Sequence, residues 1–226
     1  MIGVFDSGEG GRLTVEIIRE HLPEADIAFI ADSKNAPYGT KSRTEIISYS
    51  KENIRRLCEV GAKKILIACC TASTVYPSLS TYERSIAIPI IEPTAIAAIA
   101  ETKTDKIGVI ATQATVKAAA FSKCIRTHSP KAKVTEIATQ ELVSLIEGGA
   151  RDENISRGDL SKIKSILGCV KDGDFDTLIL GCTHFPRLIK TISDITEKRI
   201  VSSAHMGALE IIKYSEEKEK GITLYL

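Results

Sequence analysis

The sequence predicts an α/β fold made of two similar halves, each a parallel β-sheet layered between helices. Short, continuous runs of Ile, Val, Leu and Ala alternate along the chain with longer segments whose apolar residues recur at helical spacing. This alternation is typical of βαβ units. The short runs lack the polar–apolar alternation of half-exposed strands, which indicates strands that are covered on both faces. Two short motifs also recur at similar offsets along the chain.

Each short apolar run corresponds to one expected strand. The expected strands span residues 2–5, 27–31, 65–69, 88–91, 107–111, 134–138, 178–181 and 200–201. The expected helices between them span residues 13–21, 46–59, 115–127, 140–147, 161–170 and 204–217. Ser42, Asp159 and Ser203 stand at the start of three of these helices, and side chains of these types commonly cap a first turn.

The recurring motifs indicate an internal duplication. Ile2-Gly3-Val4 recurs as Ile107-Gly108-Val109, 105 residues later, and the segment 66–71 resembles 178–183, 112 residues later. The two offsets agree closely, so the halves are expected to share one architecture.

The duplication leads to a prediction of the domain boundaries. The join is expected near Glu92-Pro93, after the fourth strand, and the last helix with residues 222–225 is expected to pack back on the first half. The predicted first domain therefore comprises residues 1–92 with about 205–226, and the predicted second domain comprises residues 93–204.

Composition excludes several classes of protein. Thirty Lys and Arg against twenty-nine Asp and Glu leave a net charge of +1, and aromatic residues make up only 5% of the chain. Neither favours nucleic acid as the main partner. The segment 65–82 lacks charge, but its six Ser and Thr and its Pro77 make it too polar to span a membrane. Because residues 2–5 lack the pattern of a signal peptide, the six cysteines are expected to be reduced thiols in the cytoplasm.

Small, polar and thiol-bearing residues follow four of the expected strands. They are Asp6 to Gly11, Asp32 with residues 37–40, Cys69 to Ser73, and Cys182 to Pro186. In open parallel sheets, ligands bind beyond the carboxyl ends of the strands, so these residues predict a site at that edge.

The glycine-rich segment 6–11 does not match a nucleotide-binding loop. A dinucleotide motif would need glycine where Leu13 stands, and no Gly-Lys followed by Ser or Thr is present. Two interpretations remain open. The segment is either a flexible turn between strand and helix, or a loop that presents backbone N–H groups, Asp6 and Ser7 to a small polar ligand such as a carboxylate.

Two of the six cysteines differ from the rest in their surroundings. Cys69 and Cys182 are each followed by Thr and the start of a helix, and helix N-termini lower the pKa of a thiol. His184 lies two residues after Cys182 and could tune or protonate it. The other interpretation, a small buried apolar side chain, is applied to Cys58, Cys124 and Cys169, which lie in helical segments.

Metal binding is a weaker interpretation of the same residues. Cys69, Cys70, Cys182 and His184 could hold zinc, but the Cys-x₂₋₄-Cys spacing of structural zinc sites is absent, and so is the Cys-x-x-Cys pair of redox proteins. No metal site is therefore predicted.

Several motifs in the same order carry a resemblance to a known family over nearly the whole chain. They are Gly3-Val4-Phe5-Asp6-Ser7-Gly8 with Gly10-Gly11, Pro37-Tyr38-Gly39, Ala68-Cys69 with Thr71-Ala72-Ser73, Ile91-Glu92-Pro93, Ala114-Thr115-Val116, and Gly181-Cys182-Thr183-His184-Phe185-Pro186. The chain resembles the bacterial glutamate racemases of the cofactor-independent aspartate/glutamate racemase superfamily. The resemblance implies two flavodoxin-like, three-layer domains with the active site in the cleft between them.

The resemblance also implies a chemistry for the two thiols. Racemisation removes the α-proton from one face of an amino acid and returns a proton to the other face, a task for two opposed acid–base groups. By resemblance, Cys69 and Cys182 are this pair, Asp6 assists Cys69, and His184 with Glu147 assists Cys182. No cofactor and no metal is implied.

The implied substrate is L- or D-glutamate, with D-glutamate supplied for peptidoglycan and hence for cell shape. By resemblance, the substrate-binding residues are Asp6, Ser7, Pro37, Tyr38, Gly39, Cys70, Thr71, Thr115, Thr183 and His184. The resemblance also allows a homodimer in the cytoplasm, without nucleic-acid or membrane partners.

The sequence departs from the family pattern at several positions. The family's substrate-binding Asn after the first catalytic Cys is Cys70 here, which leaves open whether Cys69 or Cys70 is the first base. Arg12 is inserted into the usual Gly-Gly-Leu-Thr, a Cys-Pro pair reads Thr139-Gln140, and the chain ends soon after Leu224. Two alternatives therefore stay open: a racemase or isomerase for another acidic substrate such as aspartate, and a non-catalytic binding protein of the same fold.

Overall fold

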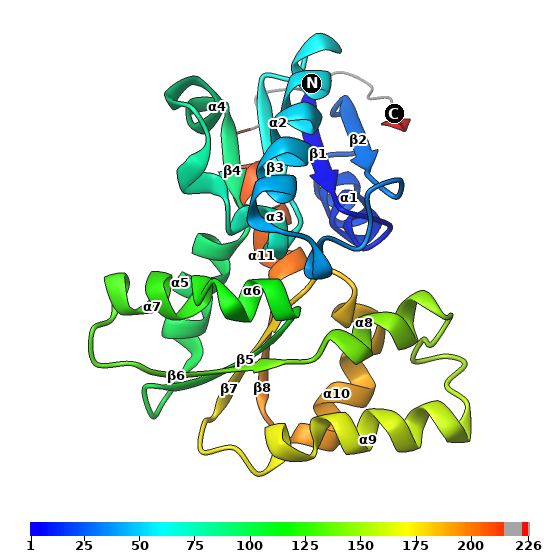
Figure 1. Ribbon diagram of the computed structural model, residues 1–226, viewed down its shortest axis with the longest axis vertical. Helices are drawn as coiled ribbons and strands as arrows, with labels where there is room; N and C mark the ends of the chain where they lie inside the picture. The colour runs from blue at the N-terminus through cyan, green and yellow to red at the C-terminus, as the bar shows by residue number, and fades with distance from the viewer. Residues whose placement is uncertain (215–222, 226) are drawn as a thin grey trace.

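The computed structural model describes residues 1–214 and 223–225 as two lobes, one above the other in Figure 1. Each lobe is built on one parallel sheet, with the strand orders β4-β3-β1-β2-β9 and β6-β5-β7-β8. The strands of the upper sheet are β1 (Ile2–Asp6), β2 (Ile27–Ala31), β3 (Lys64–Ile67), β4 (Ala87–Pro89) and β9 (Thr223–Tyr225). Those of the lower sheet are β5 (Lys106–Ala111), β6 (Lys133–Ala138), β7 (Thr177–Gly181) and β8 (Arg199–Ser202).

The two sheets confirm the predicted α/β class and the internal duplication. In each lobe the first strand lies between the second and the third, and the fourth lies beyond the third. The recurring motifs fall on equivalent strands, β1 with β5 and β3 with β7. Each sheet therefore has its switch in strand order between its first and third strands, which is where open α/β sheets bind ligands.

Helices and short 3₁₀ turns connect the strands. The α-helices are α1 (Gly11–His21), α2 (Arg43–Glu59), α3 (Cys70–Ser73), α4 (Thr81–Ile86), α5 (Ile91–Glu101), α6 (Gln113–Lys117), α7 (Ala120–His128), α8 (Gln140–Glu147), α9 (Arg157–Lys171), α10 (Ile189–Thr196) and α11 (Ser203–Ile212). The 3₁₀ turns are η1 (Tyr38–Thr40), η2 (Tyr76–Ser78) and η3 (Phe185–Leu188). No helix among the described residues is long and apolar enough to cross a membrane.

Burial on both faces explains why the central strands are continuous apolar runs. Every residue of β1 and of β7 is buried. Val4 packs in the cluster that includes residues of α1 and α11, whereas its neighbour Phe5 packs in the cluster that includes residues of α2. The Val4 cluster extends through α5 into the lower lobe, where it includes Ile107 and Val109. Helices α5 and α11 thus pack between the lobes and give them a common core.

The chain returns to the upper lobe at its end. Strand β9 pairs in parallel with β2, and α11 packs against α1. Figure 1 shows the N-terminus and β9, the red strand, at the top of that lobe. Residues 215–222 and 226, which belong to the predicted first-domain segment, lie outside the described residues. The predicted domain boundaries stay a prediction, which the division of the strands between the two sheets supports.

Two predicted helix caps were wrong by a few residues. Helix α9 is capped by Ser156, whose hydroxyl accepts from the backbone N–H of Asp159 at 3.0 Å, so Asp159 lies inside the first turn. Helix α11 is capped by Ser202 rather than Ser203. The cap predicted at Ser42 is confirmed, with a capping box to Glu45.

Three predicted boundaries also differ from the structure. The expected helix 115–127 is broken into α6 and α7 at Ala119, whose φ of 49° is left-handed. Strand β3 ends at Ile67, because Cys69 caps helix α3 instead. Strand β4 ends at Pro89, and Ile91 begins helix α5, which sequence reasoning missed. The predicted join at Glu92-Pro93 therefore lies in the first turn of α5, where proline is tolerated.

Candidate active site

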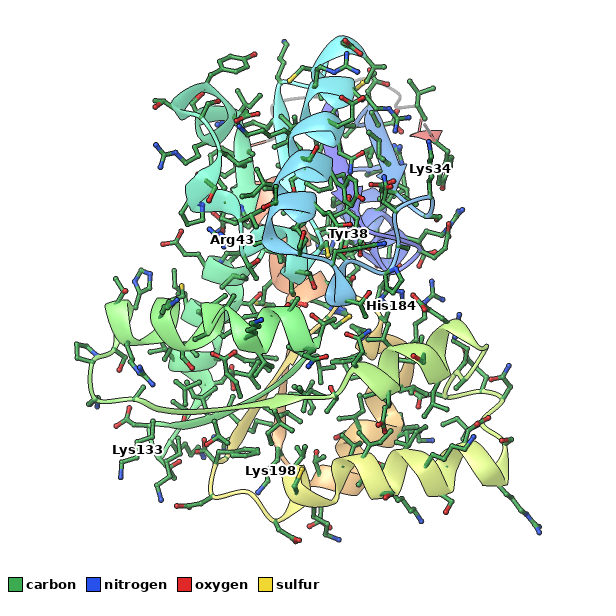
Figure 2. The ribbon with its side chains drawn as sticks, in the orientation of Figure 1. Lys34, Tyr38, Arg43, Lys133, His184 and Lys198 are labelled. Atoms are coloured by element: carbon green, nitrogen blue, oxygen red, sulfur yellow. The ribbon has the colours of Figure 1, made fainter. Side chains whose placement is uncertain are left out.

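A pocket lies between the lobes, at the carboxyl ends of the strands that flank the two switch points. The pocket is nearly closed, with a free volume of about 20 Å³. Figure 2 shows Tyr38 and His184 where the upper and lower lobes meet. The lining residues are Ser7, Ala36, Pro37, Tyr38, Gly39, Cys69, Cys70, Thr71, Thr112, Gln140, Val143, Glu147, Gly181, Cys182, Thr183 and His184. Of the predicted site residues, Asp6 and Thr115 are not in the lining, but each bonds to a residue that is.

Cys69 faces the pocket from the upper lobe. It precedes helix α3, where its sulfur accepts from the backbone N–H of Ala72 at 3.5 Å, and its thiol donates to Ser7 Oγ at 3.3 Å. Burial, with a smaller contribution from the Asp6 charge, raises the pKa of the Cys69 thiol to about 11. The prediction of a lowered pKa was wrong for the closed pocket, because one short helix offsets only part of the cost of burying a thiolate.

Asp6 connects the two lobes. It is the last residue of β1, and one carboxylate oxygen accepts from the backbone N–H of Gly8 at 2.9 Å. The other accepts from the Thr183 hydroxyl of the lower lobe at 2.8 Å. Burial raises the pKa of Asp6 to about 6. Ser7, rather than Asp6, is the hydrogen-bond partner of the Cys69 sulfur, and Asp6 acts on Cys69 through its charge.

Cys182 faces the pocket from the lower lobe and has a different set of neighbours. Its sulfur lies 3.5 Å from Nδ1 of His184, and Nε2 of that ring lies 3.6 Å from the Glu147 carboxylate at the end of α8. These three side chains form a line from the pocket toward solvent, since Glu147 is the half-exposed member. The arrangement can carry a proton between sulfur and imidazole and orient the imidazole from behind.

Burial dominates the protonation of this second group as well. It raises the pKa of the Cys182 thiol well above its usual range, contrary to the predicted lowering. Burial, with the charges of Arg187 and Arg151, lowers the pKa of His184 to about 4. In the closed structure His184 is therefore neutral near pH 7 and can accept a proton.

Three threonine hydroxyls meet beside the thiols. Thr71 Oγ lies 2.8 Å from Thr112 Oγ and 3.2 Å from Thr115 Oγ, and the last two lie 2.9 Å apart. Thr71 comes from the upper lobe and the other two from the lower lobe. Such a cluster can donate hydrogen bonds to a carboxylate, because each hydroxyl hydrogen can rotate.

Sequence reasoning missed Thr112 and Gln140, although the chain carried a signal for both. The sequence Ile-Ala-Thr-Gln occurs at 110–113 and again at 137–140, at the ends of the paired strands β5 and β6. A polar Thr-Gln pair at the carboxyl ends of two neighbouring strands is a signal of the same kind as the four polar segments named above.

The turn at Pro37-Tyr38-Gly39 is held from behind by a buried polar network. The Tyr38 hydroxyl donates to the Asp32 carboxylate at 2.5 Å, and Asn53 donates to both of them. In front, Gly39 lies so close to Gln140 and Thr112 that a Cβ on it would collide with both. The network therefore fixes one wall of the pocket, and glycine lets the lobes approach at that wall.

The glycine-rich loop has a similar steric role. A Cβ on Gly10 would lie 2.5 Å from Thr183 Oγ and 2.9 Å from His184 Nδ1. Around Gly8, in the same loop, a Cβ would have open space. The contact at Gly10 argues against a free flexible turn, the first of the two interpretations left open by the sequence. The second, a loop that presents backbone N–H groups, Asp6 and Ser7 to a small polar ligand, stays a prediction.

The remaining cysteines show mixed outcomes. Cys70 is buried, begins α3 and lines the pocket, and burial raises the pKa of its thiol. Cys58 and Cys124 are partly buried, but Cys169 is exposed, so its predicted role as a buried apolar side chain was wrong. Within residues 1–214 and 223–225, no group of three His, Cys, Asp or Glu side chains is arranged to hold a metal ion.

Comparison with known proteins yields a consistent set of relatives. Residues 12–211 match the family described as Asp/Glu/hydantoin racemase. A glutamate racemase from Lactobacillus helveticus is 39% identical over 186 residues, which are 82% of this chain and 68% of that protein. A glutamate racemase structure from Bacillus anthracis matches with a TM-score of 0.89 at 31% identity, covering 100% of this chain and 87% of that one. One from Francisella tularensis, in complex with D-glutamate, matches with a TM-score of 0.87 at 27% identity, covering 99% and 87%.

Proposed function

Because the chain belongs to the Asp/Glu/hydantoin racemase family, we propose that it interconverts L- and D-glutamate without a cofactor, using Cys69 and Cys182 as the two proton-transfer groups. The observation that carries this proposal is the placement of the two thiols. They come from equivalent strand ends of the two lobes, and both line one pocket. An α-carbon held between them would have one sulfur on each face.

The proposed reaction transfers two protons. One cysteine, as the thiolate, removes the α-proton and becomes a thiol, and the electron pair passes into the α-carboxylate as an enolate-like state. The other cysteine, as the thiol, then donates its proton to the opposite face and becomes the thiolate. When the product departs, the two cysteines have exchanged roles, and the site is ready for the reverse reaction.

A thiolate must form in a pocket that favours the neutral thiol. The ammonium group of a bound amino acid brings a positive charge beside the sulfurs, and an opposite charge at close range lowers a thiol pKa. On the Cys182 side, the neutral His184 can take the thiol proton, with Glu147 behind it to stabilise the imidazolium. On the Cys69 side, the Ser7 hydroxyl and the Ala72 N–H can donate to the thiolate.

The same pocket offers neutral hydrogen-bond donors for the developing charge. None of the lining residues is Lys or Arg, so the carboxylate must be bound by hydroxyls and backbone N–H groups. We assign this role to the Thr71 hydroxyl, with Thr115 acting through it, and to the backbone N–H of Thr183, whose hydroxyl donates to Asp6. The Ser7 hydroxyl joins them when Cys69 is the thiol and needs no donor. Donors fixed in place before the reaction stabilise charge that appears in the transition state.

Cys70 favours a second candidate. It lines the pocket where the family pattern has an amide side chain, so another acidic substrate such as aspartate is the alternative. For either substrate, we keep as proposals the remaining expectations from the resemblance, namely D-glutamate supply to peptidoglycan, a cytoplasmic location and a homodimer.

Racemisation in D₂O tests the proposal. The purified protein would be given L- and D-glutamate and, in parallel, L- and D-aspartate, with neither pyridoxal phosphate nor metal added. We expect the circular dichroism of glutamate to decay to zero from both enantiomers while the α-proton signal is lost to deuterium. Faster turnover of aspartate would favour the alternative, and no exchange with any of the four would favour a non-catalytic protein of this fold.

A further inference from the structure

Gln140 is a pocket residue that the two-thiol reaction does not use. It is the first residue of helix α8 and lines the pocket beside Gly39 and Thr112. Its Oε1 atom is buried and has no hydrogen-bond partner among the described residues. Buried polar atoms in folded proteins usually have a partner, so no protein hydrogen bond fixes this carboxamide oxygen, and the group is free to reorient toward a ligand.

The position of Gln140 on its helix separates it from the proton transfers. Gln140, Val143 and Glu147 all line the pocket, and their spacing of three and four residues places them on one face of α8. Glu147 lies at the end that contacts His184. Gln140 lies seven residues earlier, about 10 Å along the helix axis. It is therefore next to the part of the pocket that is remote from the Cys182 relay.

The charges in the pocket indicate what this remote part would bind. An acidic amino acid brings two carboxylates, and the lining contains no Lys or Arg to receive them. Gln140 supplies the only carboxamide among the lining residues of the described chain. Because no protein group holds its oxygen, the amide can turn about its last bond and present Nε2, which is a donor.

We propose that Gln140 is a specificity-determining residue, which donates from Nε2 to the side-chain carboxylate of the substrate. This inference rests on the proposed racemase function, because it assumes an acidic amino acid in the pocket. It assigns Gln140 to binding and not to chemistry, since the residue lies at the opposite end of α8 from Glu147, which contacts His184.

The chain contains a natural control for this residue. Gln113 ends the first copy of Ile-Ala-Thr-Gln and is the first residue of α6, as Gln140 ends the second copy and is the first residue of α8. The two strands that precede them are paired in register. Gln113 is exposed and is not among the pocket-lining residues. Its replacement therefore reports the cost of losing an N-terminal Gln from a helix without touching the pocket.

The test uses the full chain with Gln140→Met, Gln140→Glu and Gln113→Met. For each protein, kcat and KM for glutamate racemisation and the Kd for glutamate by calorimetry would be measured. We expect Gln140→Met to raise KM and Kd about tenfold, as for loss of a hydrogen bond to a charged group, with kcat nearly unchanged. Gln140→Glu should weaken binding further, because it opposes two carboxylates. Gln113→Met should match the wild type.

Three outcomes would overturn the inference. One is a Kd for Gln140→Met within twofold of the wild type. A second is a Gln140→Glu variant that binds glutamate as tightly as the wild type, which would mean that the carboxamide oxygen accepts from the ammonium group instead. A third is a wild-type protein that neither binds nor racemises glutamate or aspartate. If the wild type binds one of them without racemising it, only the proposed reaction fails, and the Kd values for that ligand still decide the role of Gln140.

Discussion

The two lobes share one strand order but surround their thiols with different chemistry. Cys69 and Cys182 each follow the third strand of a sheet, beside the switch in strand order. The upper thiol has a hydroxyl partner in Ser7, whereas the lower one has an imidazole in His184 that is itself paired with Glu147. A duplicated backbone thus brings two equivalent atoms to one pocket, while the side chains around them have diverged.

Burial favours the neutral form of both Asp6, the acid of the site, and His184, its base. It raises the pKa of Asp6 to about 6 and lowers that of His184 to about 4, so that the neutral form of each is favoured. Both shifts have desolvation as their largest cause. The closed pocket therefore disfavours every isolated charge, and a charged substrate must supply the compensation.

The largest expected effect tests whether both thiols are needed. Cys69→Ser and Cys182→Ser should each lower racemisation by about 10³-fold or more, because a serine hydroxyl is a far weaker base than a thiolate. Cys169→Ser, which alters an exposed thiol outside the pocket, should leave the rate unchanged. Polarimetry on matched protein concentrations measures all three. A single thiol variant that kept the wild-type rate would remove that side from the mechanism.

The second prediction concerns stability. With rising pH, the contributions of Asp6 and His184 to the unfolding free energy should change in opposite directions. Asp6 has a raised pKa when folded, so its contribution to the unfolding free energy is present below pH 3.8 and lost as the pH rises through about 6. His184 has a lowered pKa, so its contribution is present above pH 6.5 and lost as the pH falls toward 4. Each contribution is about 3 kcal/mol.

Urea unfolding between pH 4 and pH 7 measures these contributions. Relative to the wild type, Asp6→Asn should gain about 3 kcal/mol of stability as the pH rises across this range, and His184→Asn should gain about the same amount as the pH falls. If the unfolding free energies of the two variants and the wild type changed with pH in parallel, burial would not shift the pKa values of Asp6 and His184 as proposed.

A third prediction separates the close contact between the lobes from the chemistry itself. Gly10→Ala should lower activity by about 100-fold, because its Cβ would displace Thr183 and His184, and small misplacements of reacting groups are costly. Gly8→Ala lies in the same loop with open space around it and should retain nearly full activity. Equal activity of the two variants would show that the loop does not need to approach the lower lobe.

The smallest expected effect probes the relay on the Cys182 side alone. Glu147→Gln keeps the shape of the side chain but removes the charge behind His184, and should lower kcat about tenfold. Since racemisation has an equilibrium constant of one, kcat/KM must stay equal in both directions. The asymmetry should instead show in the α-deuterium isotope effect, which should rise only for the enantiomer whose proton Cys182 removes. A rise for both enantiomers would place Glu147 in a general structural role.

The sequence was most informative where burial leaves a regular pattern. Continuous apolar runs located the strands, because a strand covered on both faces needs apolar residues at every position. Helix 140–147 was predicted with its observed bounds, whereas the helix from Ile91 to Glu101 was missed. That helix carries apolar residues on its outer face as well, such as the exposed Ile96 and Ala100, so the one-sided periodicity of a surface helix is weak.

The sequence by itself determined the α/β class, the duplication and the presence of Cys69 and Cys182 at equivalent strand ends, since these depend on local patterns of apolar and polar residues. Only the tertiary structure decided which lobe-to-lobe contacts form, such as the hydrogen bond from Thr183 to Asp6, 177 residues apart. It also decided the protonation of the site, because a pKa depends on how many atoms of both lobes exclude water from a group. The helix N-termini that follow Cys69 and Cys182 in the sequence predicted lowered thiol pKa values. Burial between two packed lobes raises these pKa values instead.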